Sequence, residues 1–469
     1  MLNSIQQIAL ELGEKVSNYA EEGTITDLDQ MASDVFQDCK KATLAMLRQL
    51  TDQINRSIRD DKAGRKQNNL VLKEKNRPRT ILLKLGSFTY ERDCYYNKET
   101  KAYLYPLDEI LQIEKYERIG GTVSAELVTQ ATECSYGKSA RSVSEAFACG
   151  ERISRQTVKR KIEKAAMLEK EPPEEKKAVR ELHVYADEDH AHLQRADHGK
   201  KNQMVPLVTV AEERTAECKG RNRNVNPQHF VDETMDTKRL WEAVDGYIQQ
   251  AYDVEKGIGI IVHGDGGGWI ARGLQAYPQV IHAMDGFHLE KRTKALGRLF
   301  PKKNVKQRVY AAIKADDWKR MDEILQELML AAENQKSEDA VKAYGKYLEN
   351  HYEEIRVRLS GEIPGSCTEG LVSHVLSERF SRNPMGWSKA NLGKLSKLRV
   401  YVLNGGQIAA EAFRGETKET YSTYSQRMIE EVKTKKYDWS MYEREPKIFD
   451  GNSGTQREIR NLGRQKKVS

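Results

Sequence analysis

Three acidic residues are so placed in the sequence that their carboxylates could hold divalent cations together. Asp187 ends a strand-like run, and Asp265 follows a second apolar run of β-branched residues. Glu369 begins a segment whose apolar residues recur at helical spacing. Carboxylates from two strands and a later helix can converge on two metal ions, which stabilise both the attacking and the leaving oxygen at phosphorus. The pattern predicts an enzyme that cuts and rejoins phosphodiester backbones.

The first carboxylate lies in an unusually acidic strand end, where Asp187, Glu188 and Asp189 are consecutive. Like charges at this spacing repel one another unless a cation lies nearby. A solvated turn into the next strand would account for the same residues. Asp189 is the second candidate for the ligand.

The second carboxylate, Asp265, is followed by three glycines at 266–268. Glycines let the backbone approach an ion or phosphate closely, and open α/β sheets bind ligands at the carboxyl ends of their strands. A plain strand-to-helix turn is the alternative. No Gly-Lys-Ser/Thr follows, which excludes a P-loop.

Asp285 and His288 follow the next apolar run and are one helical turn apart. At this spacing the two side chains can orient each other or touch a common ion. The alternative is a helix that begins at Asp285, with His288 bonded locally.

Glu369 has an alternative role in a capping box, because Ser366 stands three residues before it. Other glutamates also lie nearby in sequence, at positions 353, 354, 362 and 378. A zinc site is a further alternative, formed by His183, His190, His192 and His198. Their irregular spacing, with no cysteine pair, fits tetrahedral coordination poorly.

The segments around these residues predict an α/β protein with several parts. Residues 1 to about 75 have helical spacing, and strands are expected within 80–105. Three helices follow, and a charged Pro-Pro linker then leads into the region of the carboxylates. There we expect a mixed sheet of five strands with a helix at about 236–252, followed by a helical insertion. The expected strands are 181–187, 190–195, 203–212, 258–263 and 279–284.

The third of the three helices has features of a DNA-recognition helix. Ser154 is placed to cap it, and a glycine at 150 precedes it. Such a helix offers its first turn to base edges and its basic residues to phosphates. A surface helix with a solvated basic face is the alternative. The DNA contacts predicted here are Arg155, Gln156, Lys159 and Arg160.

Three residues after the third carboxylate could also contact DNA. Arg379 and Arg382 could meet phosphates, and Trp387 could stack on an unpaired base. The alternative is that the arginines are ordinary surface residues and that the tryptophan belongs to the core.

Composition limits the class of protein. The chain has 469 residues, of which 31% are charged, with a net charge of +7. No apolar run of about 18 residues is present, so we expect no membrane span, and no secretory signal is evident at the start. The six cysteines form no CxxC pair, which fits a reducing cytoplasm. We therefore expect a cytoplasmic protein.

Taken together, the ordered motifs resemble those of the ISLre-type family of bacterial insertion-sequence transposases, which is distantly similar to the Mutator-like DDE transposases. The motifs lie at 186–190, 264–269, 285–288, 368–370 and 383–387, preceded by 90–92 and 107–109. The resemblance covers nearly the whole chain from about residue 80 onward. Each motif alone is weak, but the ordered set is specific.

The resemblance implies an RNase H-like catalytic core interrupted by an all-helical insertion. Its Asp-Asp-Glu triad would be Asp187, Asp265 and Glu369, with Asp285 and His288 as accessory residues. The implied parts are an N-terminal helical region (1–78), a small β region (79–118), a helix-turn-helix domain (119–170), the first part of the core (179–300), the insertion (301–360), the second part of the core (361–405) and a basic tail (406–469).

The function implied is that of a DDE transposase, which binds terminal inverted repeats and catalyses DNA cleavage and strand transfer. The expected cofactor is a pair of Mg²⁺ ions, with Mn²⁺ able to substitute. The expected partners are double-stranded DNA, as element ends and target, and further copies of the chain on that DNA. Two alternatives are an inactive, transposase-derived DNA-binding protein and a metal-dependent nuclease without strand transfer.

Overall fold

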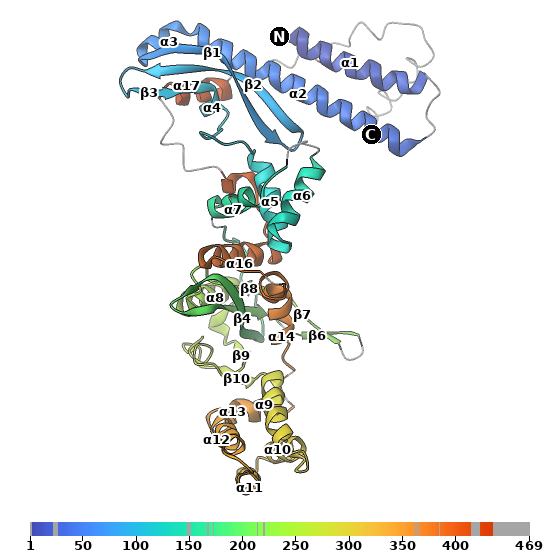
Figure 1. The fold of residues 1–469 in the computed structure, drawn as a ribbon, viewed down its shortest axis with the longest axis vertical. Coiled ribbons are helices and arrows are strands. Elements are labelled where there is room, and N and C mark those ends of the chain that lie inside the picture. The colour runs from blue at the N-terminus through green and yellow to red at the C-terminus, as the bar shows by residue number, and fades with distance from the viewer. Residues whose placement is uncertain are drawn as a thin grey trace. The chain divides into compact units, whose positions relative to one another are not determined.

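The chain, seen here as a computed structural model, divides into two compact units (Figure 1). Unit 1 comprises Met1–Thr80, Thr89–Tyr116 and Glu416–Ser469, and unit 2 comprises Ile81–Phe88 and Glu117–Gly415. The structure describes residues 2–21, 27–147, 152–166, 168–171, 173–212, 214–218, 221–361, 363, 365–383, 385–413 and 423–434. No helix among these residues is long and apolar enough to cross a bilayer.

Unit 1 combines helices with a three-stranded sheet of order β1-β2-β3. Its elements are α1 (Leu2–Glu21), α2 (Leu28–Asp60), α3 (Lys62–Gln67), β1 (Leu70–Leu83), β2 (Gly86–Asn97), β3 (Ala102–Leu104), α4 (Pro106–Ile110) and α17 (Thr423–Thr434). The predicted small sheet is present, and its first strand begins earlier than expected, at Leu70. The fully buried Asp93 is neutralised by Arg59, with 2.7 Å between Nε and Oδ2.

Helix α17 corrects the expectation that 406–469 is a simple basic tail. Tyr424 is only 1% exposed, and its hydroxyl donates to Asp61. Arg427 forms an ion pair with the same carboxylate at 2.5 Å. This part of the tail is therefore folded as part of unit 1, whereas residues 435–469 lie outside the described residues.

Unit 2 begins with three helices, α5 (Gly121–Glu133), α6 (Tyr136–Ala146) and α7 (Arg155–Lys164). They pack around fully buried apolar side chains from each helix, including Leu127, Val143 and Ile162. The predicted cap of α7 is confirmed, because Ser154 Oγ accepts the backbone N–H of Thr157 at 3.1 Å. The helix ends at Lys164.

The centre of unit 2 is a mixed five-stranded sheet of order β10-β9-β4-β5-β8 (Figure 1). Strands β4, β9 and β10 are parallel, and β4, β5 and β8 are antiparallel. The strands are β4 (Glu181–Asp197), β5 (Lys200–Ala211), β8 (Gln228–Phe230), β9 (Gly259–Gly264) and β10 (Val280–Met284). The predicted mixed sheet of five strands is present, but the first two predicted strands form the single β4, and β8 was not predicted.

Two features complete this sheet. Helix α8 (Thr237–Ala251) and the short η1 (Val254–Lys256) lie between β8 and β9, and α8 packs on Val184 and Val262 of the sheet. A hairpin of β6 (Arg214–Cys218) and β7 (Arg221–Asn224), which the sequence analysis missed, follows β5.

The predicted helical segment at 303–358 is confirmed, and the helices already begin at Gly286. They are α9 (Gly286–Leu299), α10 (Val305–Lys314), α11 (Trp318–Leu330), α12 (Gln335–Asn350) and α13 (Tyr352–Leu359). They form a cluster next to β10 in unit 2 (Figure 1) with its own core. Met321, Ile324 and Leu328 are each at most 1% exposed there, whereas Trp318 is half-exposed.

The chain then returns to the sheet through α14 (Thr368–Val372), the π-helical turn η2 (Ser373–Ser377), α15 (Glu378–Phe380), α16 (Lys389–Leu403) and η3 (Ala410–Phe413). Helix α14 packs against β4. The residues before α16 also pair with β4, since Trp387 N donates to His192 O and Gln194 N donates to Trp387 O, both at 2.9 Å.

A first prediction concerns Gly393 in α16, where a Cβ would overlap the carbonyl oxygen of Glu233. In an open helix Gly→Ala stabilises by up to about 1 kcal/mol. Gly393→Ala is expected instead to destabilise unit 2 by about 1–3 kcal/mol, because the backbone must shift. Gly246→Ala in α8 is the matched control, with no atom within 4 Å of the added Cβ. Thermal unfolding of both variants tests this, and equal melting temperatures would contradict it.

Candidate metal centre

Asp187 lies on β4, the middle strand of the sheet, with its side chain on the opposite face from the core under α8. Leu182, Val184 and Ala186 alternate with it and pack in that core. Asp187 is 7% exposed, and its Oδ1 accepts the backbone N–H of Glu188 at 2.8 Å. The alternative of a solvated turn is wrong, because β4 continues to Asp197.

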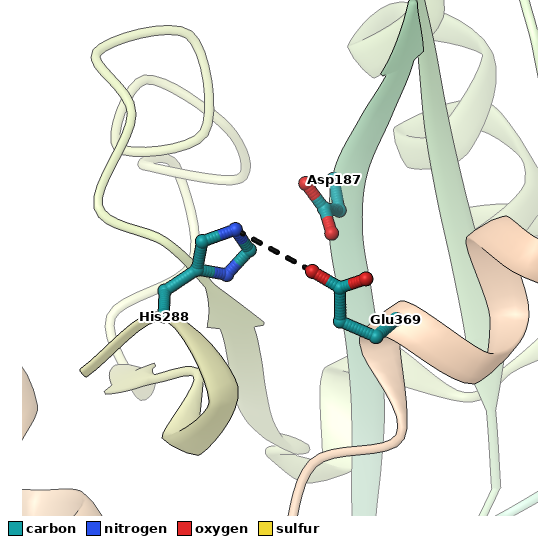
Figure 2. A group of neighbouring side chains, drawn as sticks. All are labelled: Asp187, His288 and Glu369. Carbon is teal, nitrogen blue, oxygen red and sulfur yellow. Dashed lines mark ion pairs between the residues drawn. The ribbon is translucent and has the colours of Figure 1, made fainter. Parts of the chain in front are cut away.

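Glu369 reaches the same place from α14. Its carboxylate, the ring of His288 and the carboxylate of Asp187 each offer a ligand atom, and these three atoms lie within 4.8 Å of one another. Figure 2 shows the three side chains turned toward one another from a strand and two helices. The Nε2 of His288 is 3.6 Å from Oε1 of Glu369.

The capping-box alternative for Glu369 is wrong, because α14 begins after Cys367 with no side-chain cap. Ser366 Oγ instead accepts the backbone N–H of Thr368 at 3.2 Å. The side chain of Glu369 therefore does not cap its own helix. It is half-exposed and available to a ligand.

His288 is held by Asp285, the residue before α9. Its Nδ1 is 3.0 Å from Oδ2 of Asp285, which is 5% exposed. This hydrogen bond raises the pKa of His288, and nearby Asp187 raises it further. A carboxylate that holds one ring nitrogen leaves the other directed at a ligand, which is the usual support of a metal-binding histidine. The expected pairing of these two residues is present, and Asp285 also occupies the N-cap position.

Burial opposes the ionised form of Asp187, although nearby His288 favours it. Its pKa is raised to about 7, chiefly by burial and further by repulsion from Glu369 and Glu188. A bound cation would reverse this effect, because it favours the ionised carboxylate.

Asp265 lies beside this group, one residue beyond β9. Strand register pairs Tyr185 with His263, so Asp187 and Asp265 each stand two residues further along neighbouring parallel strands. The two strands pack closely at this point, since a Cβ on Gly264 would lie 3.2 Å from the carbonyl oxygen of Ala186. Asp265 is nevertheless outside the group of three, since its Oδ1 accepts the backbone N–H of Gly267 at 2.8 Å. Its role as a ligand stays a prediction.

The other acidic residues of the β4 motif have partners of their own. Glu188 accepts the indole N–H of Trp269 at 2.8 Å, and Asp189 accepts the hydroxyl of Ser381 at 2.9 Å. Trp269 belongs to the glycine-rich motif and Ser381 to the segment after α15. The side chains of β4 thus hold both flanking segments around Asp187.

Sequence reasoning missed the aromatic stack beneath the carboxylates. His183, Tyr185 and His263 lie on the Asp187 face of the sheet, and the rings of Tyr185 and His263 are 4.8 Å apart. The Nδ1 of His183 is 3.1 Å from Nε2 of His263. Period-2 alternation from Asp187 and Asp265 was the available signal. Among the described residues, the four histidines of the zinc alternative form no metal-ligand group.

The residues predicted to contact DNA through α7 lie mostly at its surface. Arg155, Gln156 and Arg160 are exposed. Lys159 is partly covered and lies 3.5 Å from Glu163, one turn further on. The residues of the turn before α7, at 148–151, lie outside the described residues.

Two of the later DNA candidates occupy the interior instead. Arg379 is 2% exposed, donates to Ala131 O at 2.8 Å and lies 4.8 Å from the ring centroid of Trp387. Trp387 is 5% exposed, so it belongs to the core, as the alternative stated. For Arg379 both the prediction of a phosphate contact and the alternative of a surface residue are wrong, because this arginine is buried. Arg382 is exposed and bonds to Glu378.

A second prediction follows from the hydrogen bond between His288 and Asp285. Asp285→Asn removes the largest cause of the raised pKa, so the pKa of His288 is expected to fall. At pH values just above 6.5 the fraction of charged imidazole should drop accordingly. An NMR titration of His288 in metal-free protein measures this. Asp245→Asn, which removes a carboxylate bonded to Tyr277, should leave the His288 titration as it is in the unsubstituted protein.

Comparison with known proteins places the chain in a family. The Uncharacterised protein family (UPF0236) matches residues 21–417. The chain belongs to this family. A UPF0236 protein of Caldanaerobacter subterraneus subsp. tengcongensis, whose name joins four designations, is 35% identical over 363 residues, covering 76% of this chain and 74% of the relative. Another from the same organism, whose name joins eleven designations, is 34% identical over the same shares. A "UPF0236 protein in vanSb 3'region" of Streptococcus gallolyticus is 22% identical over 342 residues, 70% of this chain and 73% of the relative.

Proposed function

We propose that this chain is a DDE transposase of the ISLre type, which cuts DNA at the ends of its own element and joins those ends to a target. The observation that carries the proposal is the meeting of Asp187 and Glu369, which are 182 residues apart in sequence, around a common point with His288. Among the described residues, no lysine or arginine forms an ion pair with either carboxylate, and Glu369 is paired with His288.

The sheet supports an RNase H-like core as the scaffold. That fold has three antiparallel strands followed by two parallel ones, with its acidic residues at the central strand and its parallel neighbour. The order β10-β9-β4-β5-β8, with its directions, fits this description. An all-helical segment between β10 and the helix of Glu369 fits the interrupted form of the core.

The donor set fits a hard divalent cation. Carboxylate oxygens are the ligands that Mg²⁺ and Mn²⁺ prefer. Burial raises the pKa of Asp187, and a bound cation would favour its ionised form. Asp187 and Glu369 would hold the metal, with Asp265 completing the set after it exchanges its bond to Gly267. When bound, the metals supply Lewis-acid stabilisation to the oxygens of an in-line displacement.

The chain's own residues then have separable roles. Asp187 fixes the position of the site, because it is buried on the middle strand of the sheet. Asp285 holds His288 with Nε2 directed at the carboxylates, where the imidazole can carry a proton close to the reacting oxygens. Trp269, bonded to Glu188, keeps the glycine-rich turn against β4.

DNA recognition is assigned to the three helices α5–α7, as a helix-turn-helix with α7 in the major groove. Its exposed first turn offers Arg155 and Gln156 to base edges, and Arg160 to phosphates. Phosphate contacts position a duplex and base contacts select its sequence. Joining two ends calls for at least two copies of the chain on the DNA.

The names of relatives also favour a gene that belongs to a mobile DNA element. One relative's name joins eleven designations from a single organism. We interpret these as copies of one gene, which is what an element that inserts repeatedly into a genome leaves behind.

Strand-transfer assays with labelled element ends test the proposal. The wild type is expected to join them to plasmid DNA in Mg²⁺, and Asp187→Asn, Asp265→Asn and Glu369→Gln are expected to lose this activity. Full activity in any variant would remove that residue from the triad. Cuts without joined product would indicate a nuclease, and binding without cuts an inactive DNA-binding protein.

A further inference from the structure

A pocket adjoins the candidate metal centre. It has a volume of about 440 Å³ and lies among the first residues of α9, Tyr310 of α10, Arg358 of α13 and the start of α14. Glu369 lines it, so the pocket and the metal centre share a wall. Its size suits a small ligand or a single unit of a polymer.

Arg358 gives this pocket a cation without a counter-ion. Its Nε is buried and has no hydrogen-bond partner, and no ion pair joins it to another described residue. Its guanidinium lies over α9, since a Cβ on Gly286 would be 3.5 Å from Nε and Nη2. The N-terminal end of α9 adds positive partial charge at the same point. An unpaired buried donor is costly, so the geometry favours an incoming anion.

The carboxylates of the pocket are already engaged. Asp285 is bonded to His288, and Glu290 lies 2.9 Å from Lys294 and 2.6 Å from Lys306. Glu369 faces the metal centre. The charge left over for a ligand is therefore that of Arg358, and its planar fork suits a phosphate.

Phe287 provides an apolar surface beside that charge. It is 48% exposed, although it lies next to His288 in sequence and its ring centroid is 5.5 Å from that of His288. An exposed aromatic ring next to a basic group is the pairing by which proteins hold an unpaired base and its phosphate.

We propose that this pocket holds one nucleotide of the DNA strand being cut, next to the scissile phosphate, with its phosphodiester on Arg358 and its base against Phe287. This inference rests on the proposed function for its substrate, but the pocket can be tested without catalysis. The nucleotide must leave the base stack to enter, which places the pocket among the determinants of cleavage position.

Binding of thymidine 5′-monophosphate to the full chain, with Ca²⁺ present, is the first test. Arg358→Gln is expected to weaken binding about tenfold or more, and Phe287→Ala several-fold. Arg356→Gln is the matched control on the same helix, since Arg356 is paired with Glu353 and is not part of the pocket. Thermal melting checks that all variants are folded. Equal affinities of the two arginine variants, or no binding by the wild type, would overturn the proposal.

The second test uses methylphosphonate substitution, which removes the charge from one phosphate at a time. In single-turnover assays, methylphosphonate at one position beside the scissile phosphate is expected to slow cleavage by the wild type about tenfold. The same substitution is expected to leave the cleavage rate of Arg358→Gln unchanged. If both proteins respond alike at every position, Arg358 does not bind that phosphate. A wild type that never cleaves would count against the proposed function, and the nucleotide titration would still decide the pocket.

Discussion

Asp187→Asn is expected to abolish metal-dependent DNA cleavage and, in metal-free protein at pH 8, to raise the melting temperature. The two effects have one cause. The carboxylate supplies the charge that holds the cation, and the loss of several kcal/mol of charge stabilisation corresponds to a rate loss of about 10³-fold or more. Without a cation the same buried charge destabilises the fold.

The pH dependence follows from the pKa of Asp187, which burial raises from 3.8 to about 7. The unfolded chain loses this proton near pH 4 and the folded chain near pH 7. The destabilisation is therefore absent below about pH 4, grows as the pH rises to 7 and is constant above it, where it is on the order of 4 kcal/mol. Asparagine carries no such charge.

Thermal unfolding in EDTA across pH 4–8 measures this effect. The gap between Asp187→Asn and the wild type should open as the pH rises, and Mg²⁺ should narrow it by stabilising only the wild type. Asp322→Asn, on the exposed surface of α11, is the control and should show no gap. A variant that melts below the wild type at pH 8 without metal would contradict the claim that burial of the Asp187 carboxylate destabilises the metal-free fold.

Arg399→Met is expected to cause the largest loss of stability in unit 2, about 3–5 kcal/mol. Arg399 is 3% exposed and donates to three backbone carbonyls. Those of His374 and Val375 belong to the π-helical turn η2, and that of Thr132 belongs to α5; the three distances are 2.6–2.7 Å. The methionine fills the space but leaves these carbonyls buried without a donor.

The same variant is expected to slow cleavage more than its lower stability explains. The turn η2 continues directly from α14, which carries Glu369, so two of the three carbonyls that Arg399 holds, those of His374 and Val375, lie in this continuation of the helix. Arg399 is thus a positioning residue between the three-helix region and the metal centre. Cleavage rates at 10 °C, where both proteins are folded, separate the two effects. Arg382→Met, which alters an exposed arginine bonded to Glu378, is the control. Equal stability of the two variants would refute this role.

The sequence was most informative where the structure follows a simple period. Alternation of apolar residues around Asp187 predicted both the strand and the face on which the carboxylate lies. Four of the five strands of the large sheet and the helical character of 301–360 were also predictable. Strand lengths were not, since β4 continues through the polar residues His190 and His192, whose backbones pair with β5 and with the loop before α16.

The site was predictable in part. Asp187, Glu369 and Asp285 were predictable because an acidic residue at the end of an element is easily recognised, and His288 because it stands one helical turn after Asp285. The closeness of His288 to Glu369 depends on how α9 and α14 pack after 80 intervening residues, which no local pattern encodes. Arg379 misled the prediction for the same reason, since only the fold decides that an arginine is buried among aromatic rings.

Anomalous diffraction from crystals soaked in Mn²⁺ tests the central claim most directly. A peak is expected between Asp187 and Glu369, with carboxylate oxygens at about 2.0–2.4 Å, and it should be lost in Asp187→Asn crystals. Saturating Mn²⁺ with no peak at this point, or a peak that persists after both carboxylates are replaced by amides, would contradict the account.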